Sequence, residues 1–224
     1  MVRLTMKELK VELRKLLSKL SEDLERKEKL KDYLVSTSRR IIKAAGDAVI
    51  SIHSERLEEA DELIRKASSL LNEALKQIEG QIEYLYEGPL PQALKEYVEA
   101  LTFYRVYQGQ SPPSPAELNV PLKPYIYGLT EVVGEARRRV IDSLRKDKIE
   151  EAERWLEIME AFYGALRELE LYRSALPDIK HKVDQVRRLT EVTRGDVALA
   201  TQRNRLRQDL RRLEERLRGT SNHG

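Results

Sequence analysis

The chain has 224 residues, of which 41% are hydrophobic and 35% are charged. This mixture is typical of helix-rich proteins with much exposed helix surface, and the length allows one large domain with a sizeable core. The formal net charge is only +3, which argues against a uniformly basic nucleic-acid binder, so any anion site must come from local clustering. Cysteine is absent, which excludes disulfides, thiolate zinc sites and cysteine nucleophiles, and three histidines leave little material for a histidine-based zinc centre or a Ser-His-Asp triad.

The sequence contains no candidate membrane segment. No apolar run approaches the roughly 18 residues of a spanning helix, and the N-terminal residues lack the apolar core of a signal peptide. We therefore expect a cytoplasmic protein with no membrane partner.

Apolar residues recur at helical spacing along most of the chain, and no stretch shows the alternation of a strand. Helices are expected, in chain order, over residues 4–32, 34–53, 57–79, 91–108, 122–146, 149–173 and 177–217. The first two either form one continuous helix or break near residues 30–33, and the last has a candidate break near Gly195. The pattern predicts an all-α fold, a single-domain bundle of about seven helices over residues 1–218 with a disordered tail at 219–224.

Glycine and proline mark the connections between these helices. They cluster at residues 88–91 and at 109–115, and the second cluster is the clearest loop of the chain. Short connections favour antiparallel neighbouring helices. An alternative division is an N-terminal helical hairpin followed by a separate C-terminal bundle.

The helix expected at 122–146 has an acidic face. Glu131 and Glu135 lie four residues apart, almost opposite the apolar stripe of this helix. Gly128 and Gly134 each cost roughly 1 kcal/mol relative to alanine in a helix, so each needs a reason such as a close backbone approach. With the arginines at 137–139, the two carboxylates could hold a metal ion beside an anion, or they could form a solvated face.

A second acidic pair, Glu96 and Glu99, lies on one face of the preceding helix. If the two helices face each other, four carboxylates converge, and their mutual repulsion and burial raise their pKa values. A hard divalent cation such as Mg²⁺ or Mn²⁺ relieves such repulsion and can activate water at a phosphodiester. Acidic pairs are abundant in a chain with 38 Asp and Glu residues, so a solvated face remains an alternative.

Basic residues gather at two places, where they either contact phosphates or form solvated faces. Arg39, Arg40 and Lys43 lie on one expected helix, and the arginines at 137–139 lie on another. His53 ends an apolar-rich helix, where a packed or capping role is expected. The arginine-rich end at 203–218 also contains acidic residues, which suits nucleic-acid binding, a salt-bridged helix or an oligomer contact.

Aromatic residues form clusters at Tyr104/Tyr107 and at Trp155/Phe162. Such clusters are typical of a core or of a subunit interface, and we expect part of this surface to be covered by another protomer.

Three stretches in order resemble the translin superfamily, and most closely translin-associated factor X (TRAX). The first, Glu96-Tyr-Val-Glu-Ala100, is similar to an EYVEA motif of the family. The second is similar to a YLxGxxDxxGExxR pattern and covers Tyr125–Glu135 with Arg138. The third is similar to a late helix of the family and covers Lys182–Arg188 with Glu191. The resemblance is specific over about residues 92–194.

The resemblance implies an all-α chain in a closed hollow homo-octamer. Translin binds single-stranded nucleic acid, and TRAX-type chains carry the acidic site of a Mg²⁺-dependent endoribonuclease facing the interior of the shell. It therefore implies RNA, or single-stranded DNA, as a partner and Mg²⁺ or Mn²⁺ as the cofactor. The alternative is a non-catalytic, translin-like nucleic-acid-binding protein.

Residue by residue, the resemblance implies that the catalytic and metal-binding positions are Glu96, Glu99, Glu131 and Glu135. Glu131 stands where the family has aspartate, and its longer side chain changes the geometry at that ligand. We expect RNA phosphates to be contacted by Arg39, Arg40, Lys43 and Arg138.

Overall fold

The structure is a computed structural model that describes the backbone of residues 5–221 and the side chains of residues 5–215. Over this range the fold is all-α and contains no strand, as the sequence predicts. The α-helices are α1 (Met6–His53), α2 (Leu57–Gln77), α3 (Leu90–Tyr107), the one-turn α4 (Pro115–Leu118), α5 (Leu122–Arg145), α6 (Ile149–Arg167) and α7 (Ile179–Ser221). Two short 3-10 helices are η1 (Ile82–Leu85) and η2 (Glu168–Tyr172).

The two helices expected before residue 54 form one continuous helix, α1, of 48 residues. Thr5 and Glu8 form a capping box at its start, so the first free backbone amides are satisfied. Residues 30–33 contain neither glycine nor proline, which leaves nothing to break the helix there. The helix ends at His53, two residues before Glu55 adopts a left-handed φ of 61°.

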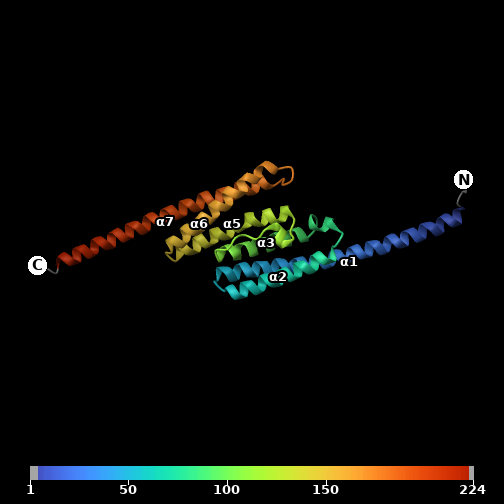
Figure 1. Ribbon diagram of the computed structural model, residues 1–224, viewed down its shortest axis with the longest axis horizontal. Helices are drawn as coiled ribbons and strands as arrows, with labels where there is room; N and C mark the ends of the chain where they lie inside the picture. The colour runs from blue at the N-terminus through green and yellow to red at the C-terminus, as the bar shows by residue number, and fades with distance from the viewer. Residues whose placement is uncertain (1–4, 222–224) are drawn as a thin grey trace.

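The helices pack in three successive layers (Figure 1). The C-terminal half of α1 forms an antiparallel hairpin with α2, α3 and α5 form the middle layer, and α6 and α7 cover the far side of α5. One core cluster joins α1, α2 and α3, and a second joins α1, α3, α5, α6 and α7. The hairpin is therefore packed on α3 as part of a single bundle.

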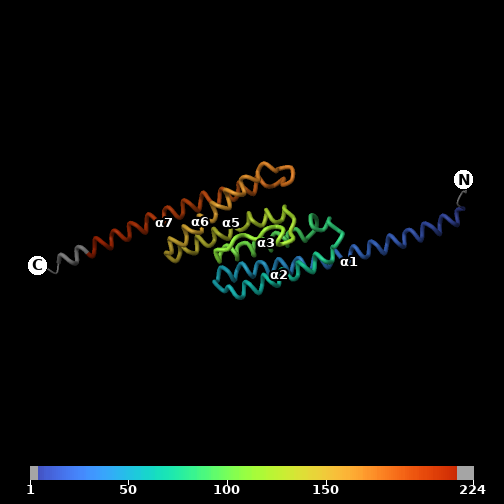
Figure 2. Tube along the Cα trace, viewed as in Figure 1, coloured from blue at the N-terminus to red at the C-terminus, as the bar shows by residue number. Residues whose placement is uncertain are grey.

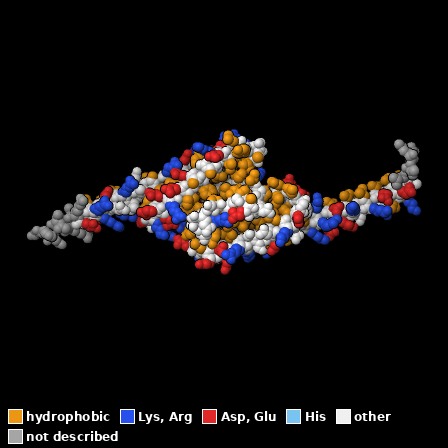
Figure 3. All heavy atoms as spheres, viewed as in Figure 1, with side chains coloured by type: hydrophobic (Ala, Val, Ile, Leu, Met, Phe, Trp, Pro, Cys, Tyr) orange, Lys and Arg blue, Asp and Glu red, His pale blue; other side chains and the backbone are white. Residues whose placement is uncertain are grey.

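The two ends of the chain form helical arms that leave the bundle in opposite directions (Figure 2). In the N-terminal arm, residues 6–29, all side chains are exposed except the half-buried Asp23. Figure 3 shows apolar atoms along one edge of this arm. Its exposed large apolar side chains are Met6, Leu9, Val11, Leu13, Leu16, Leu17, Leu20 and Leu24. The C-terminal arm exposes Leu206, Leu210 and Leu213.

Gly128 lies where α3 and α5 approach each other most closely. A Cβ atom built there would lie 2.7 Å from Val98 Cγ1 and 2.8 Å from the backbone oxygen of Lys95. Only glycine allows the two helices to come this close, which explains why a glycine stands at position 128 within a helix. A Cβ atom on Gly134 would meet nothing within 4 Å, and nothing in the structure explains that glycine.

Several details differ from the sequence expectations. α7 passes through Gly195 without a break, and the helix expected to reach residue 173 ends at Arg167 and continues as η2. Trp155 is buried within the chain against Phe103 and Tyr107, so it belongs to the core and not to a subunit surface.

The end of the chain is helical for longer than expected. α7 continues to Ser221. Residues 222–224, the rest of the tail expected at 219–224, lie outside the described residues. No helix among the described residues has a stretch long and apolar enough to cross a membrane.

Candidate active site

The close contact between α3 and α5 brings the four glutamates together. Glu96 and Glu99 come from α3, and Glu131 and Glu135 come from α5. The other three carboxylates all lie close enough to Glu99 to raise its pKa. The structure therefore has the convergence of two acidic pairs that their spacing suggested.

Glu99 is the most strongly perturbed of the four. Burial, followed by the negative charges of Glu96, Glu135 and Glu131, raises the pKa of Glu99 to about 8. Without a cation this side chain is mostly protonated at neutral pH. A carboxyl group in such surroundings favours the arrival of positive charge, which would restore its ionised form.

Glu131 has the opposite protonation behaviour because two lysines neutralise it. Its Oε1 atom accepts a hydrogen bond of 3.0 Å from Lys182 Nζ, and Lys95 Nζ lies 3.5 Å from the same atom. Burial alone would raise the pKa of Glu131, but the hydrogen bond from Lys182 and the charges of Lys95 and Lys182 outweigh it and lower the pKa. Lys95 Nζ also lies 3.5 Å from Glu96 Oε1.

Glu135 is held by the last residue of α1. Its Oε2 atom lies 2.5 Å from His53 Nε2, and the His53 side chain is only 5% exposed. The imidazole also packs on Phe103, with ring centroids 5.1 Å apart, and its buried Nδ1 has no protein partner. Nε2 is therefore the ring nitrogen that bonds the carboxylate of Glu135.

The donor set of the site suits a hard divalent cation. Four carboxylates supply the oxygen ligands that Mg²⁺ and Mn²⁺ prefer, and the raised pKa of Glu99 reflects its burial among the other three negative charges. As arranged among the described residues, no group of three or more Asp, Glu or His side chains forms a ready-made metal cage. In this arrangement Lys182 and Lys95 contact Glu131, and His53 contacts Glu135.

A basic stripe on α1 leads toward this site. Arg39, Lys43, Gly46, Ile50 and His53 follow one another at intervals of three or four residues, so they share one helix face. The helical rise separates Arg39 from His53 by about 21 Å. The first four of these residues are exposed or partly exposed. A strand of nucleic acid lying along this face would reach Glu135.

Two of the four basic candidates, Arg40 and Arg138, lie outside this stripe, whereas Lys43 belongs to it. Arg40 is exposed but lies about 100° around α1 from Arg39. Lys43 Nζ lies 3.7 Å from Asp47 Oδ2 on the same helix. Arg138 is 53% exposed, with Nη1 3.9 Å from Glu135 Oε2, so it lies beside the acidic site.

The arginine run at 137–139 does not form one patch. Arg137 bonds Thr193 and lies 3.6 Å from Asp196, which ties α5 to α7. Arg139 is 3% exposed and pairs with Glu151, so it is a structural residue. Only the middle arginine is available to a ligand.

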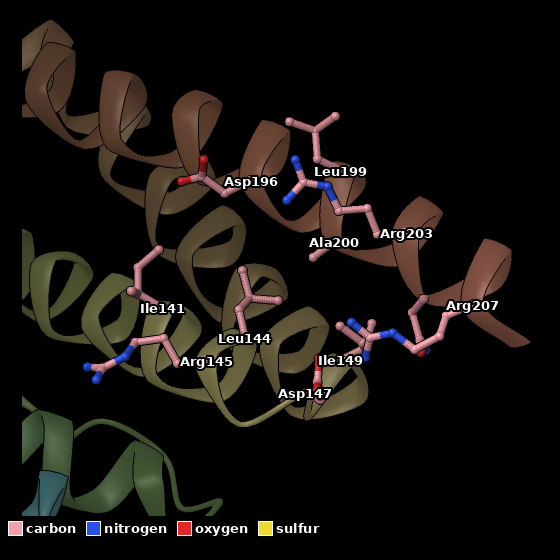
Figure 4. Close-up of a pocket in the computed structure, with 11 residues that line it drawn as sticks. Ile141, Leu144, Arg145, Asp147, Ile149, Asp196, Leu199, Ala200, Arg203 and Arg207 are labelled. Atoms are coloured by element: carbon pink, nitrogen blue, oxygen red, sulfur yellow. Dashed lines mark ion pairs between the residues drawn. The ribbon is translucent and has the colours of Figure 1, made fainter.

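A cavity of about 480 Å³ lies elsewhere, between the end of α5 and the middle of α7 (Figure 4). Arg145, Arg203 and Arg207 line it with Asp147 and Asp196. Figure 4 shows Arg207 reaching from α7 to Asp147, 3.2 Å away. Of the roles expected for the arginine-rich end, this ion pair fits a salt-bridged helix. None of the four clustered glutamates lines this cavity.

Three residues of the site were not identified from the sequence. The sequence predicts a packed or capping role for His53, places Lys182 only within a motif, and gives no role to Lys95. Two features of the sequence could have pointed to the lysines. Lys95 lies next to Glu96, and Lys182 is the first residue of the third motif. Their contacts with the glutamates of α5 span 36, 51 and 82 residues, which local periodicity cannot reveal.

Comparison with known proteins gives relatives of the same fold. No family model matches the chain. An uncharacterized protein of Methanocaldococcus jannaschii is 28% identical over 193 residues, which cover 85% of each chain. The crystal structure of apo-NeC3PO matches with a TM-score of 0.75 and 26% identity, over 82% of this chain and 96% of that chain. The structure of an AfC3PO–duplex RNA complex matches with a TM-score of 0.73 and 27% identity, over 83% of this chain and 96% of that chain. This chain therefore has the fold of C3PO chains, which supports the resemblance of its sequence to the translin superfamily.

Proposed function

We propose that this chain is an RNA-binding, divalent-cation-dependent endoribonuclease of the TRAX type. The observation that carries the proposal is the convergence of four glutamates from α3 and α5, which raises the pKa of Glu99 to about 8. The similarity to a C3PO chain solved with duplex RNA supports RNA as the substrate class. Mg²⁺ or Mn²⁺ is the proposed cofactor.

Each side chain of the site has a distinct part in this proposal. Glu96, Glu99, Glu131 and Glu135 would hold the cation, whose chemistry in phosphodiester hydrolysis is to activate water and to neutralise developing charge. His53 orients Glu135 through its 2.5 Å contact. Arg138 lies beside the site, where it can bind a phosphate.

RNA would reach the site along the stripe of α1 that contains Arg39 and Lys43, with Arg40 on the adjacent face. Each phosphate contact that is removed should weaken binding to all sequences alike and lower the salt slope by about one. A sequence-selective loss of binding after substitution of these residues would contradict the proposed role.

The decisive experiment is cleavage of labelled RNA with Mg²⁺ or Mn²⁺, with EDTA as the control for metal dependence. Glu99→Ala and Glu135→Ala should abolish cleavage and leave RNA binding nearly intact, because they remove ligands and not core packing. Glu58→Ala, at an exposed position of α2, is the matched control. Cleavage by both site variants at the wild-type rate would show that the acidic site is not the active site.

The second candidate function is a non-catalytic, translin-like protein that binds RNA or single-stranded DNA. The contacts of Lys95 and Lys182 with Glu131 favour it, since they already neutralise one carboxylate without a cation. The same assay separates the two functions, because a binding protein would retain RNA without cutting it.

We further propose that the working form is a cytoplasmic homo-octamer. The exposed leucines of the N-terminal arm support assembly, because an isolated helix that shows a continuous apolar stripe to water is stabilised by a partner. The closed, hollow arrangement follows from the resemblance to the translin superfamily.

A further inference from the structure

Two ammonium groups converge on a single oxygen of the acidic site. Lys182 Nζ lies 3.0 Å from Glu131 Oε1, and Lys95 Nζ lies 3.5 Å from the same atom. The lysine side chains are only 20% and 18% exposed, so neither is a freely solvated surface group. Glu131 is therefore neutralised in the chain by positive charges from α3 and α7.

A divalent cation bound by the four glutamates would meet these ammonium groups at Glu131. Like charges repel, and the cation and the two ammonium groups would share the negative charge of one carboxylate. Binding of the cation must therefore displace at least one lysine or be weakened by both. Lys95 has little freedom to leave, because its backbone packs against Gly128 and its ammonium group also contacts Glu96.

Lys182 is better suited to move. It lies in the first turn of α7, where the helix dipole disfavours a positive charge unless an anion is near. Its Nζ already lies 5.0 Å from the centroid of the Tyr127 ring, which offers a second attractive position beside the carboxylate. An RNA phosphate at the site would provide the anion that Glu131 now provides.

We propose that Lys182 neutralises Glu131 when no cation is bound. Once a cation has displaced it from Glu131, Lys182 binds the RNA phosphate. This inference rests on the proposed nuclease function. It assigns to Lys182 two linked roles, competition with the cation and contact with the substrate, so that cation and RNA enter the site together.

The first test measures metal binding without RNA. Mn²⁺ would be titrated into the full-length protein, with the free ion counted by electron paramagnetic resonance. Lys182→Met should bind Mn²⁺ about tenfold more tightly, the effect of removing one positive charge about 6 Å from a divalent ion in a medium close to water. Lys182→Arg, which keeps the charge, should bind Mn²⁺ as the wild type does.

The matched control is Lys180→Met, because Lys180 lies in the same helical turn, is exposed and forms no ion pair among the described residues. Unchanged Mn²⁺ affinity in Lys182→Met, with unchanged circular dichroism, would overturn the inference. An equal gain in affinity in Lys180→Met would also overturn it, since the effect would then be one of net charge alone.

The second test measures RNA binding with a non-cleavable RNA at saturating Mn²⁺. Lys182→Met should weaken binding and reduce the slope of log affinity against log salt by about one, while Lys180→Met should not. An unchanged slope in Lys182→Met would remove the substrate-binding role.

The two levels of failure can be told apart. If Glu99→Ala and the wild type bind Mn²⁺ equally, the proposed metal site itself is wrong. If Glu99→Ala loses Mn²⁺ but Lys182→Met binds it as the wild type does, only the role of Lys182 is wrong.

Discussion

At the residue scale, two carboxyl groups of the acidic site have opposite pKa shifts because their surroundings differ. Burial and three neighbouring carboxylates raise the pKa of Glu99 to about 8, whereas the two lysines overcome the effect of burial and lower the pKa of Glu131. Two groups of the same chemistry thus differ in charge at neutral pH. Such a separation of pKa values is typical of sites that carry out acid–base chemistry.

The raised pKa of Glu99 predicts how stability depends on pH when no divalent cation is present. The folded chain binds the Glu99 proton more tightly than the unfolded chain, so stability is fully present below about pH 4.5 and declines as the pH rises toward 8. At about 1.4 kcal/mol per pKa unit, the upper limit of the loss is roughly 5 kcal/mol. Glu99→Gln should flatten this decline, as measured by thermal unfolding in EDTA from pH 5 to 9.

Glu131→Gln tests the opposite sign in the same measurement, and it should also lessen the decline, because the charge of Glu131 contributes to the raised pKa of Glu99. The lowered pKa of Glu131 gives the opposite sign, so its contribution is present above its unfolded pKa and is lost as the pH falls through its folded pKa. An equal decline with rising pH in the wild type and in Glu99→Gln would show that Glu99 is not the titrating group.

His53 should act as a positioning residue for Glu135. His53→Phe keeps the packing on Phe103 but removes the hydrogen bond to the carboxylate, so Mn²⁺ affinity should fall by about 10- to 100-fold, the usual cost of losing such a partner. His53→Gln, which keeps a donor, should recover part of the loss. Equal Mn²⁺ affinity in His53→Phe and the wild type would limit His53 to core packing.

At the element scale, the contact of α3 with α5 at Gly128 sets the geometry of the site. This glycine lies three residues before Glu131, and its α-carbon faces the backbone of Lys95, which precedes Glu96. A backbone atom cannot turn aside as a side chain can. Any added volume at Gly128 therefore moves one helix relative to the other and separates the two acidic pairs.

Gly128→Ala should consequently destabilise the fold by about 1–3 kcal/mol and weaken Mn²⁺ binding. Gly134→Ala is the control, since its Cβ would meet nothing within 4 Å. The control should be neutral or stabilising by up to about 1 kcal/mol, because alanine favours the helix. Chemical denaturation and the Mn²⁺ titration would measure the two effects, and identical behaviour of the two variants would contradict this account of the helix contact.

At the scale of the whole molecule, the two helical arms carry large apolar side chains that the rest of the chain does not cover. The apolar positions Met6, Leu9, Leu13, Leu16 and Leu20 alternate at intervals of three and four residues, as in the seam of a coiled coil. After Asp23 and Lys27, the same register reaches the buried face of α1 at Leu34 and Ile41. A face that α2 covers further along the helix is therefore exposed in the arm.

A variant with Leu13→Glu and Leu16→Glu should lower the assembly state, because it buries charge in any helix pair formed by this seam. Light scattering should give a multiple of the 26.0 kDa chain for the wild type and a smaller species for the variant. Ser18→Glu, on an exposed polar face of the same arm, should assemble normally. A wild-type chain that elutes as a monomer would defeat the proposed octamer.

Local sequence patterns are enough to predict the all-α class, most helix bounds and the two acidic pairs. These features depend on local periodicity and on the positions of glycine and proline, as at 88–91 and 109–115. Periodicity alone leaves the continuity of α1 across residues 30–33 open, although no glycine or proline interrupts the helix there.

The partners of each glutamate depend on how the helices pack and could not be predicted from local patterns. His53, Lys95 and Lys182 come from three different helices, and the packing of α1, α3 and α7 around α5 brings them to the site. The same packing gives the three neighbouring arginines different surroundings. Arg139 is buried, Arg137 links α5 to α7, and Arg138 is exposed beside Glu135. The physical reason is that charge, burial and protonation depend on neighbours distant in sequence, whereas helical periodicity reports only on neighbours three or four residues away.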